Sequence, residues 1–425
     1  MSKDDFDISN YLENFCFEQN MNIFEDSSSQ TKVDYVSVNG KDIPRYINEY
    51  WTSRQRQASS IHEISYRACF KPQLPRFFID LLTHEGDRVY DPFSGRGTTA
   101  IEAGMMGRNV VANDINPLSK IMSLPRFFIP EPADVEERLY EIPMYKDIKA
   151  EMDLSMFYHK DTESEIVSLR NYLQERKESS KEDDIDRWIR MVATNRLTGH
   201  SAGFFSVYTL PPNQAVSPER QIKINERLGQ KPEYRDTRRI IMKKTRNLLR
   251  NLTQKQKHNL RRAGQAAVLL CNDARHTPEI ESGSVRLTVT SPPFLDVVQY
   301  SQDNWLRCWF NFIDPDEISR RITMAGTVEE WSNVMREVFL ELFRVTEKGG
   351  WVAFEVGEVR GGKIRLDEHV VPLGLNAGFE CKGILINLQE FTKTSNIWGI
   401  NNNIHGTNTN RIVLFKKPGQ VGNGS

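Results

Sequence analysis

The sequence predicts an α/β fold with parallel strand pairing, interrupted by a large, mainly helical insertion. Signals for a strand, a helix and a second strand follow one another over residues 88–114, which is the order of a βαβ unit. Further strand patterns come only after residue 263. A βαβ unit needs only roughly 30 residues, so the charged stretch 120–262 between the two regions is predicted to be an inserted domain.

The composition along the chain predicts further boundaries. Residues 1–42 start acidic and rich in Ser, Asn and Gln, and we expect this N-terminal extension to be partly disordered. The sheet domain is expected in two parts, residues 43–119 and 263–417, on either side of the insertion at 120–262. Residues 418–425 are rich in glycine and predict a disordered tail.

The first part of the sheet domain contains two predicted helices and two predicted strands. The segment FKPQLPRFFIDLL (70–82) predicts a helix, and a short strand is predicted at Arg88–Asp91. A helix from Gly97 to Gly107 and a strand at Arg108–Asp114 follow. The insertion is largely helical by pattern and is broken near Tyr208–Pro218.

The second part resumes with strands at Ala266–Asp273 and Val285–Thr290. A helix is then expected to end at Lys348–Gly350, where another strand begins. Two last strands, around Gly383–Glu390 and Arg411–Lys416, are expected to form a closing hairpin. The helix has apolar residues at helical spacing, at Trp331, Val334, Met335, Val338, Phe339 and Leu342.

The overall composition is that of a soluble globular protein, with 39% hydrophobic and 27% charged residues. No apolar run is long enough to span a membrane, and the start MSKDDFD lacks the apolar segment of a secretory signal. The five cysteines form no CxxC pair, so no metal site is predicted. The wide spacing of the cysteines fits reduced thiols, so we expect a cytoplasmic location.

The charge is unevenly distributed. Between Arg220 and Arg262 there are 15 Lys or Arg against 3 Asp or Glu, a local balance of +12, so the rest of a chain with net charge −1 carries −13. A segregated basic segment is typical of a surface that binds a polyanion, although a solvated basic helix is the simpler alternative.

The segment DPFSGRGTT (Asp91 to Thr99) predicts a strand-to-helix turn that binds a nucleotide-like ligand. Gly95 and Gly97 can adopt positive φ and allow the ligand to approach the backbone. Thr98 and Thr99 can cap the first helical turn. The turn also fits the GxGxxA pattern of nicotinamide enzymes, which therefore stay an alternative, whereas no P-loop motif occurs.

Acidic residues are predicted at the ends of the next two strands. Asp114 can accept both ribose hydroxyls of a bound nucleoside, or it can simply cap the turn before Asn116. Asp273 ends the following strand, where an adenine amino group would lie.

The peptide TSPPF (Thr290 to Phe294) predicts a site for a flat heterocyclic amine. Two prolines fix the backbone after a buried strand, and their carbonyl oxygens are free to accept hydrogen bonds. The Ser291 hydroxyl and the Pro292 carbonyl can accept from the two N–H bonds of an exocyclic amine, and Phe294 offers a face on which a base can stack. The alternative is a structural polyproline turn.

Together these residues resemble the DNA amino-methyltransferases that use S-adenosylmethionine, in which DPFxGSGTT is the cofactor motif and [DNS]PP[YF] the catalytic motif. Serine in the first position of the catalytic motif resembles the cytosine-N4 branch. The resemblance covers residues 60–120 and 265–417 and implies a Rossmann-like, seven-stranded sheet. It differs in having Arg96 in place of the usual serine, and in having the cofactor half first. The cofactor-binding residues that it implies are Phe70, Asp91, Pro92, Phe93, Ser94, Gly95, Gly97, Thr98, Thr99, Asp114, Ile115, Asn116, Asp273 and Ala274, and the catalytic ones are Ser291, Pro292, Pro293 and Phe294.

The resemblance implies DNA as the partner, with the target base flipped out of the duplex and the insertion as the target-recognition domain. A cognate restriction endonuclease would be encoded separately, and a solitary methylase is equally open. Adenine-N6 methylation, guanine methylation in RNA and a non-catalytic DNA-binding protein stay as alternatives. The residues expected to contact nucleic acid are Arg235, Arg238, Arg239, Lys243, Lys244, Arg246 and Arg250.

Overall fold

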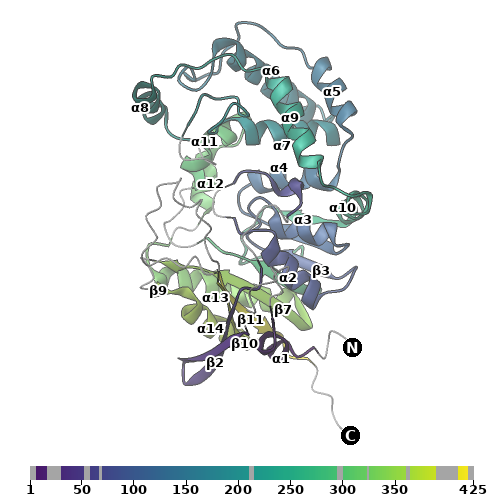
Figure 1. The fold of residues 1–425 in the computed structure, drawn as a ribbon, viewed down its shortest axis with the longest axis vertical. Helices are drawn as coiled ribbons and strands as arrows, with labels where there is room; N and C mark the ends of the chain where they lie inside the picture. Colours follow the sequence, from purple (N-terminus) through teal and green to yellow (C-terminus); the bar gives the residue numbers. More distant parts are fainter. Residues whose placement is uncertain are drawn as a thin grey trace, which may run out of the picture.

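The structure is a three-layer α/β domain with a helical part above it (Figure 1). The chain is described here by a computed structural model. It covers residues 6–16, 30–51, 58–66, 69–209, 215–293, 300–322, 325–359, 364–388 and 410–419.

A sheet of nine described strands forms the centre of the domain, in the order β1-β2-β10-β11-β7-β6-β3-β4-β5. Strand β11 is antiparallel to both of its neighbours, and the strands from β7 to β5 are parallel. The predicted α/β class is therefore confirmed, but seven strands is too low a count, because the hairpin β1–β2 adds two to one edge. The strands are β1 (Lys32–Val38), β2 (Lys41–Asn48), β3 (Arg88–Asp91), β4 (Asn109–Asn113), β5 (Val268–Leu270), β6 (Val285–Thr290), β7 (Thr346–Val356), β10 (Glu380–Asn387) and β11 (Asn410–Lys416), with a separate pair β8 (Glu358–Val359) and β9 (Ile364–Arg365).

Helices cover both faces of the sheet and form the helical part. Two short 3-10 turns, η3 (Ser60–His62) and η4 (Leu124–Phe127), link the two parts. The helices are α1 (Ile8–Glu13), α2 (Gln73–Leu82), α3 (Thr98–Met105), α4 (Leu118–Ser123), α5 (Pro132–Glu141), α6 (Lys160–Glu178), α7 (Asp184–Arg196), α8 (Pro218–Leu228), α9 (Thr237–Leu249), α10 (Gln254–Ala266), α11 (Tyr300–Phe310), α12 (Pro315–Arg321), α13 (Val328–Val345) and α14 (Leu366–Ala377).

Alternating residues of the central strands fill two hydrophobic cores, as the period of two along a strand requires. In β7, Trp351 and Ala353 point into the core beneath α2 and α3. Val352 and Phe354 point to the opposite core, which α13 and α14 cover. Both faces of the sheet are therefore buried, and only its edges and strand ends can carry a site.

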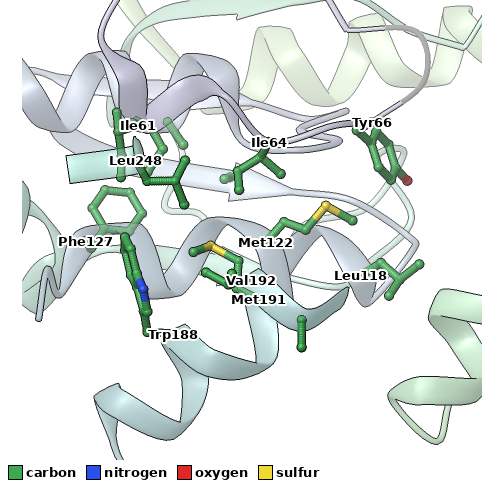
Figure 2. Close-up of a cluster of buried hydrophobic side chains, with 14 of the residues drawn as sticks. Ile61, Ile64, Tyr66, Leu118, Met122, Phe127, Trp188, Met191, Val192 and Leu248 are labelled. Carbon is green, nitrogen blue, oxygen red and sulfur yellow. The ribbon is translucent and has the colours of Figure 1, made fainter. Parts of the chain in front are cut away.

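A cluster of buried side chains joins the helical part to the sheet domain (Figure 2). It brings together Trp188 of α7, Leu248 of α9, Phe127 of η4 and the segment 61–66. The Trp188 indole also donates to the Thr245 hydroxyl at 3.1 Å. The helical part is thus packed onto a segment that, through Tyr66, reaches the cavity described below.

Several details differ from the prediction. The hairpin β1–β2 spans the boundary expected at residue 42. Helix α10, most of which lies within the predicted insertion, packs on α3 of the sheet domain, since the Asn259 side chain donates to the carbonyl of Met105 at 3.0 Å. Strand β7 begins at Thr346, before the glycine pair that was expected to precede it. Among the described residues, no helix is long and apolar enough to cross a membrane.

Candidate active site

One cavity lies where β3, β4, β5 and β6 end, and both sequence motifs line it. The glycine turn contributes Ser94, Gly95 and Thr98, and the Pro-Pro step contributes Ser291 to Pro293. Parallel strands bring their carboxyl ends to the same edge of a sheet, which explains why two distant segments meet there. The other predicted residues that line the cavity are Phe70, Pro92, Phe93, Asp114, Ile115, Asn116, Asp273 and Ala274.

The glycine turn is held in a tight conformation. Gly95 and Gly97 have φ of 52° and 77°, in the left-handed region that favours glycine. The Gly97 N–H donates to the carbonyl of Ser94 at 2.6 Å. A Cβ at Gly97 would lie 2.7 Å from the Cβ of Ser123. No side chain caps the start of α3, contrary to the expectation for the two threonines that follow.

Three predicted cofactor residues lie behind the cavity wall. One is Gly97. The other two, Asp91 and Thr99, form hydrogen bonds that join the two motifs. The Thr290 hydroxyl donates to Asp91 Oδ1 at 2.6 Å. The Thr99 hydroxyl donates to the carbonyl of Val289 at 3.0 Å. Burial raises the pKa of Asp91 to about 7, against the hydrogen bonds that it accepts.

Asp114 presents a carboxylate at the cavity wall. Its two oxygens accept from the backbone N–H groups of Gly95 at 2.7 Å and of Asn116 at 2.9 Å. Burial raises its pKa to about 6, and the two hydrogen bonds oppose that shift. Each carboxylate oxygen still has a lone pair for a ligand hydroxyl.

Asp273 also lines the cavity, but its carboxylate forms an ion pair with Arg275. The Arg275 guanidinium donates to both oxygens, at 2.6 Å from Nη2 to Oδ2 and at 3.0 Å from Nε to Oδ1. Although burial disfavours the charge, these hydrogen bonds lower the pKa of Asp273. Asp273 can accept from a ligand amino group only with its remaining lone pairs or after Arg275 moves.

Arg96, the residue that departs from the usual motif, points away from the cavity. Its guanidinium donates to the backbone carbonyls of Ile64 at 2.8 Å and His62 at 3.2 Å, and to that of Phe70 at 3.4 Å. It thereby fixes the chain segment from which Tyr66 and Phe70 line the cavity.

The Pro-Pro step leaves one of its carbonyls available. The Trp331 indole donates to the carbonyl of Pro293 at 3.0 Å. The carbonyl of Pro292 accepts no hydrogen bond from any residue that the structure describes. Phe294 lies outside the described residues. The two predicted acceptors, Ser291 and Pro292, both line the cavity.

Glu355 of β7 is a residue of the site that sequence reasoning missed. Its side chain is buried behind Ser291, and burial raises its pKa. The Asn410 amide donates to the carboxylate, and this hydrogen bond and the neighbouring Ser291 hydroxyl both work against that shift. No local pattern marks Glu355, because its proximity to Ser291 depends on the register that pairs Thr290 with Phe354.

A second group of missed residues completes the cavity. Trp331, Val334, Met335 and Val338 of α13 were predicted only as the apolar face of a helix, and part of that face closes the cavity. The others are Tyr66, Cys69, Asn272, Arg275, Arg321, Ile322 and Ala325. Proximity to a predicted residue could have indicated three of them, because Cys69 precedes Phe70, Asn272 precedes Asp273 and Arg275 follows Ala274.

Three of the seven predicted nucleic-acid contacts are hydrogen-bonded to backbone carbonyls or buried within the protein. Arg235 donates to backbone carbonyls at Phe204 and Ser206. Arg238 donates to the carbonyls of Leu139 and Ile142, both at 2.8 Å. Lys244 is only 8% exposed, and burial lowers its pKa to about 8.

The other four predicted contacts are exposed. Arg246 and Arg250 form ion pairs with glutamates, at 3.4 Å to Glu136 and 3.0 Å to Glu63. The side chains of Arg239 and Lys243 have no such partner among the described residues. The dense basic stretch is thus largely engaged within the protein.

Comparisons with known proteins agree with the motifs. Residues 9–121, which include the glycine turn, match the family model for N6/N4 DNA methylases, described as DNA methylase. The type II methyltransferase M.BsoBI of Geobacillus stearothermophilus is 23% identical over 368 residues, 77% of this chain and 68% of its own length. The type II methyltransferase M.MvaI of Kocuria varians is 31% identical over 27% of this chain and 25% of its own length.

Among solved structures, a Thermus thermophilus protein complexed with S-adenosyl-L-methionine is 22% identical, with a TM-score of 0.23, over 35% of this chain and 54% of that one. By the family match and the two type II methyltransferases, the chain is similar to DNA methyltransferases of the N4/N6 type.

Proposed function

We propose that this chain transfers a methyl group from S-adenosylmethionine to the N4 amino group of cytosine in double-stranded DNA. The observation that carries the proposal is the shared cavity, in which the glycine turn and the Ser291–Pro293 step face the same space. A methyl donor and an acceptor amine must lie next to each other for direct transfer, because holding both reactants together supplies much of the rate.

The residues at the glycine turn fit the donor. S-adenosylmethionine supplies an activated methyl group when it is bound. Asp114 offers acceptors for the ribose hydroxyls, and its ionised form suits a ligand with a positive sulfonium. The Ser94 hydroxyl is buried and has no hydrogen-bond partner among the described residues, so it is available to a ligand. Phe70 and Ile115 add apolar walls for an adenine ring.

The acceptor end is built to make an amine more nucleophilic. The lone pair of the cytosine amino group is delocalised into the ring, and acceptors for its two N–H bonds favour a pyramidal nitrogen. Ser291 and the Pro292 carbonyl supply these acceptors, while Glu355 holds the Ser291 hydroxyl proton and so turns the oxygen lone pairs outward. The Ser291 oxygen and the Pro292 carbonyl also stabilise the positive charge that develops on the nitrogen. The amine nitrogen gains the methyl group as the methyl–sulfur bond of the bound donor breaks, and the nitrogen then loses its extra proton to water.

Methylation at cytosine carbon-5 needs a cysteine thiolate, which this cavity does not provide. Of the five cysteines only Cys69 lines the cavity. Burial raises the pKa of its thiol, so Cys69 is neutral at physiological pH and a weak nucleophile. This supports transfer to an exocyclic nitrogen.

The insertion, residues 120–262, is proposed as the target-recognition domain, with the target base flipped into the cavity. A role beside a separately encoded restriction endonuclease is consistent with the relatives, whose names identify them as type II methyltransferases. The site of action would be the nucleoid of a prokaryotic cell.

Mass spectrometry of nucleosides from DNA incubated with the protein and S-adenosylmethionine tests the proposal. We expect N4-methylcytosine, and much less of it in the same time with Ser291→Ala. N6-methyladenine instead would overturn the choice of base but keep the reaction. Heat of binding with NADH and none with S-adenosylmethionine would replace the whole proposal with a nicotinamide enzyme.

A further inference from the structure

Helix α8 carries a stripe of basic side chains that the predicted contacts did not include. Arg220, Lys223 and Arg227 are exposed and lie at positions i, i+3 and i+7, within about 60° of one another around the helix at roughly 100° per residue. None of the three forms an ion pair within the described part of the chain. Glu219, one turn before Lys223, interacts electrostatically with it, and Glu226 lies on the same side of the stripe. The other side of the stripe has no acidic residue of α8.

The opposite face of α8 is anchored to the protein. Gln221 donates to the carbonyl of Tyr208 at 3.1 Å, and Asn225 donates to that of Met156 at 2.8 Å. Ile224 is buried beneath them. The basic stripe is therefore presented on a fixed helix, which limits the entropy lost when its side chains bind.

The position of α8 connects it to the acceptor end of the cavity. The Trp305 indole of α11 donates to the carbonyl of Val216 at 3.2 Å, and the N–H of Ala215 donates to that of Asp303 at 3.1 Å. Helix α11 follows the Ser291–Pro293 step in the chain, and α12 lines the cavity through Arg321. In Figure 1, α8, α11 and α12 lie on the same side of the molecule.

We infer that the α8 stripe binds backbone phosphates of duplex DNA beside the flipped base, an inference that rests on the proposed function. The stripe spans about 10 Å along the helix at roughly 1.5 Å per residue. One DNA strand presents about three phosphates over that length of duplex axis, at roughly 3.4 Å each. Helix α9, the centre of the predicted contact region, instead packs among α5, α6 and α7, and most of its cations have partners in the protein.

The chain offers a matched control for a test. Lys223→Ala/Arg227→Ala in α8 and Arg239→Ala/Lys243→Ala in α9 each remove one Lys and one Arg, four residues apart, from an exposed face. The full chain and both variants would be titrated against a random-sequence duplex by fluorescence anisotropy at several salt concentrations. Heat of binding with S-adenosylmethionine would show that each variant is folded and has its cavity.

For the α8 variant we expect the slope of log K against log salt to become less negative by about 1.8, since each phosphate contact contributes roughly 0.9. The α9 variant should keep the slope of the unaltered chain. Equal slopes for the α8 variant and the unaltered chain, or equal losses in both variants, would overturn the inference and leave the proposed function standing. Failure of the unaltered chain to bind DNA, with cofactor binding intact, would overturn both.

Discussion

Ser291→Ala tests the chemistry of the acceptor end most directly. The substitution removes one of two acceptors for the amine, while the Pro292 carbonyl stays. A hydrogen bond to a group that carries charge contributes about 1.5–3 kcal/mol. At roughly 1.36 kcal/mol for each factor of ten, the rate of methyl transfer should fall by about 10- to 160-fold.

The affinity for S-adenosylmethionine should stay unchanged in this variant. The glycine turn is fastened by the Thr290–Asp91 and Thr99–Val289 hydrogen bonds, neither of which involves Ser291. Single-turnover transfer of a radiolabelled methyl group to DNA measures the rate, and calorimetry measures cofactor binding. Because the lost contact strengthens in the transition state, kcat and kcat/KM should fall together.

A rate within threefold of the unaltered enzyme would refute this account of Ser291. A loss of cofactor binding that matches the loss of rate would show that Ser291 acts on the glycine turn instead. Glu355→Gln is the companion variant. An amide keeps an acceptor oxygen for the Ser291 hydroxyl, so its effect on the rate should be smaller than that of Ser291→Ala.

Three further predictions concern the turn, the cofactor and the insertion. Gly97→Ala should lower the free energy of unfolding by about 2–5 kcal/mol in chemical denaturation. The left-handed φ costs about 1–2 kcal/mol, and the contact with Ser123 adds about 1–3 kcal/mol. Gly229→Ala, in open space, should show only the first cost. The affinity for S-adenosylmethionine in calorimetry should fall as pH drops below about 6, because Asp114 becomes protonated, and Asp114→Asn should bind weakly without that dependence. Lys244→Met should raise the free energy of unfolding at pH 7 by about 1–3 kcal/mol, since it removes a buried cation. Between pH 8 and 10.5 the unfolded state keeps the Lys244 proton and the folded state does not, so the unaltered chain should gain stability over this range. Lys244→Met should abolish that gain. Lys243→Met should stay within about 0.5 kcal/mol.

The elements that could be predicted from the sequence are those that depend on contacts between neighbouring residues. Strands Arg88–Asp91 and Val285–Thr290 have the predicted bounds because each contains residues that favour strands, such as valine, tyrosine and threonine, and ends at a turn formed by glycine or proline. The positive φ of Gly95 and Gly97 follows from the same turn chemistry. Most predicted cavity residues belong to these turns, and the cavity lies where they meet.

Long-range contacts decided the rest. Arg235, Arg238 and Lys244 carry the same charges as Arg239 and Lys243, and only the packing of α9 against its neighbours shows which cations bind backbone carbonyls or lie buried. The place of Glu355 beside Ser291 depends likewise on strand register, which no local pattern encodes. Charge density along a sequence is therefore a weak guide to a binding surface, because some of the basic side chains form hydrogen bonds within the protein or are buried in it.

The position of the insertion explains how two motifs about 200 residues apart can form one site. The chain leaves the sheet after β4 and returns at β5, both at one edge. The strands that carry the motifs, β3 and β6, pair directly at the centre, and Asp91 and Thr290 are hydrogen-bonded there. The entropic cost of closing a loop grows only as the logarithm of its length. A longer or shorter helical part would thus leave the Asp91–Thr290 contact nearly unaffected, so the proposed target-recognition part can vary in length in this architecture while the cavity stays the same.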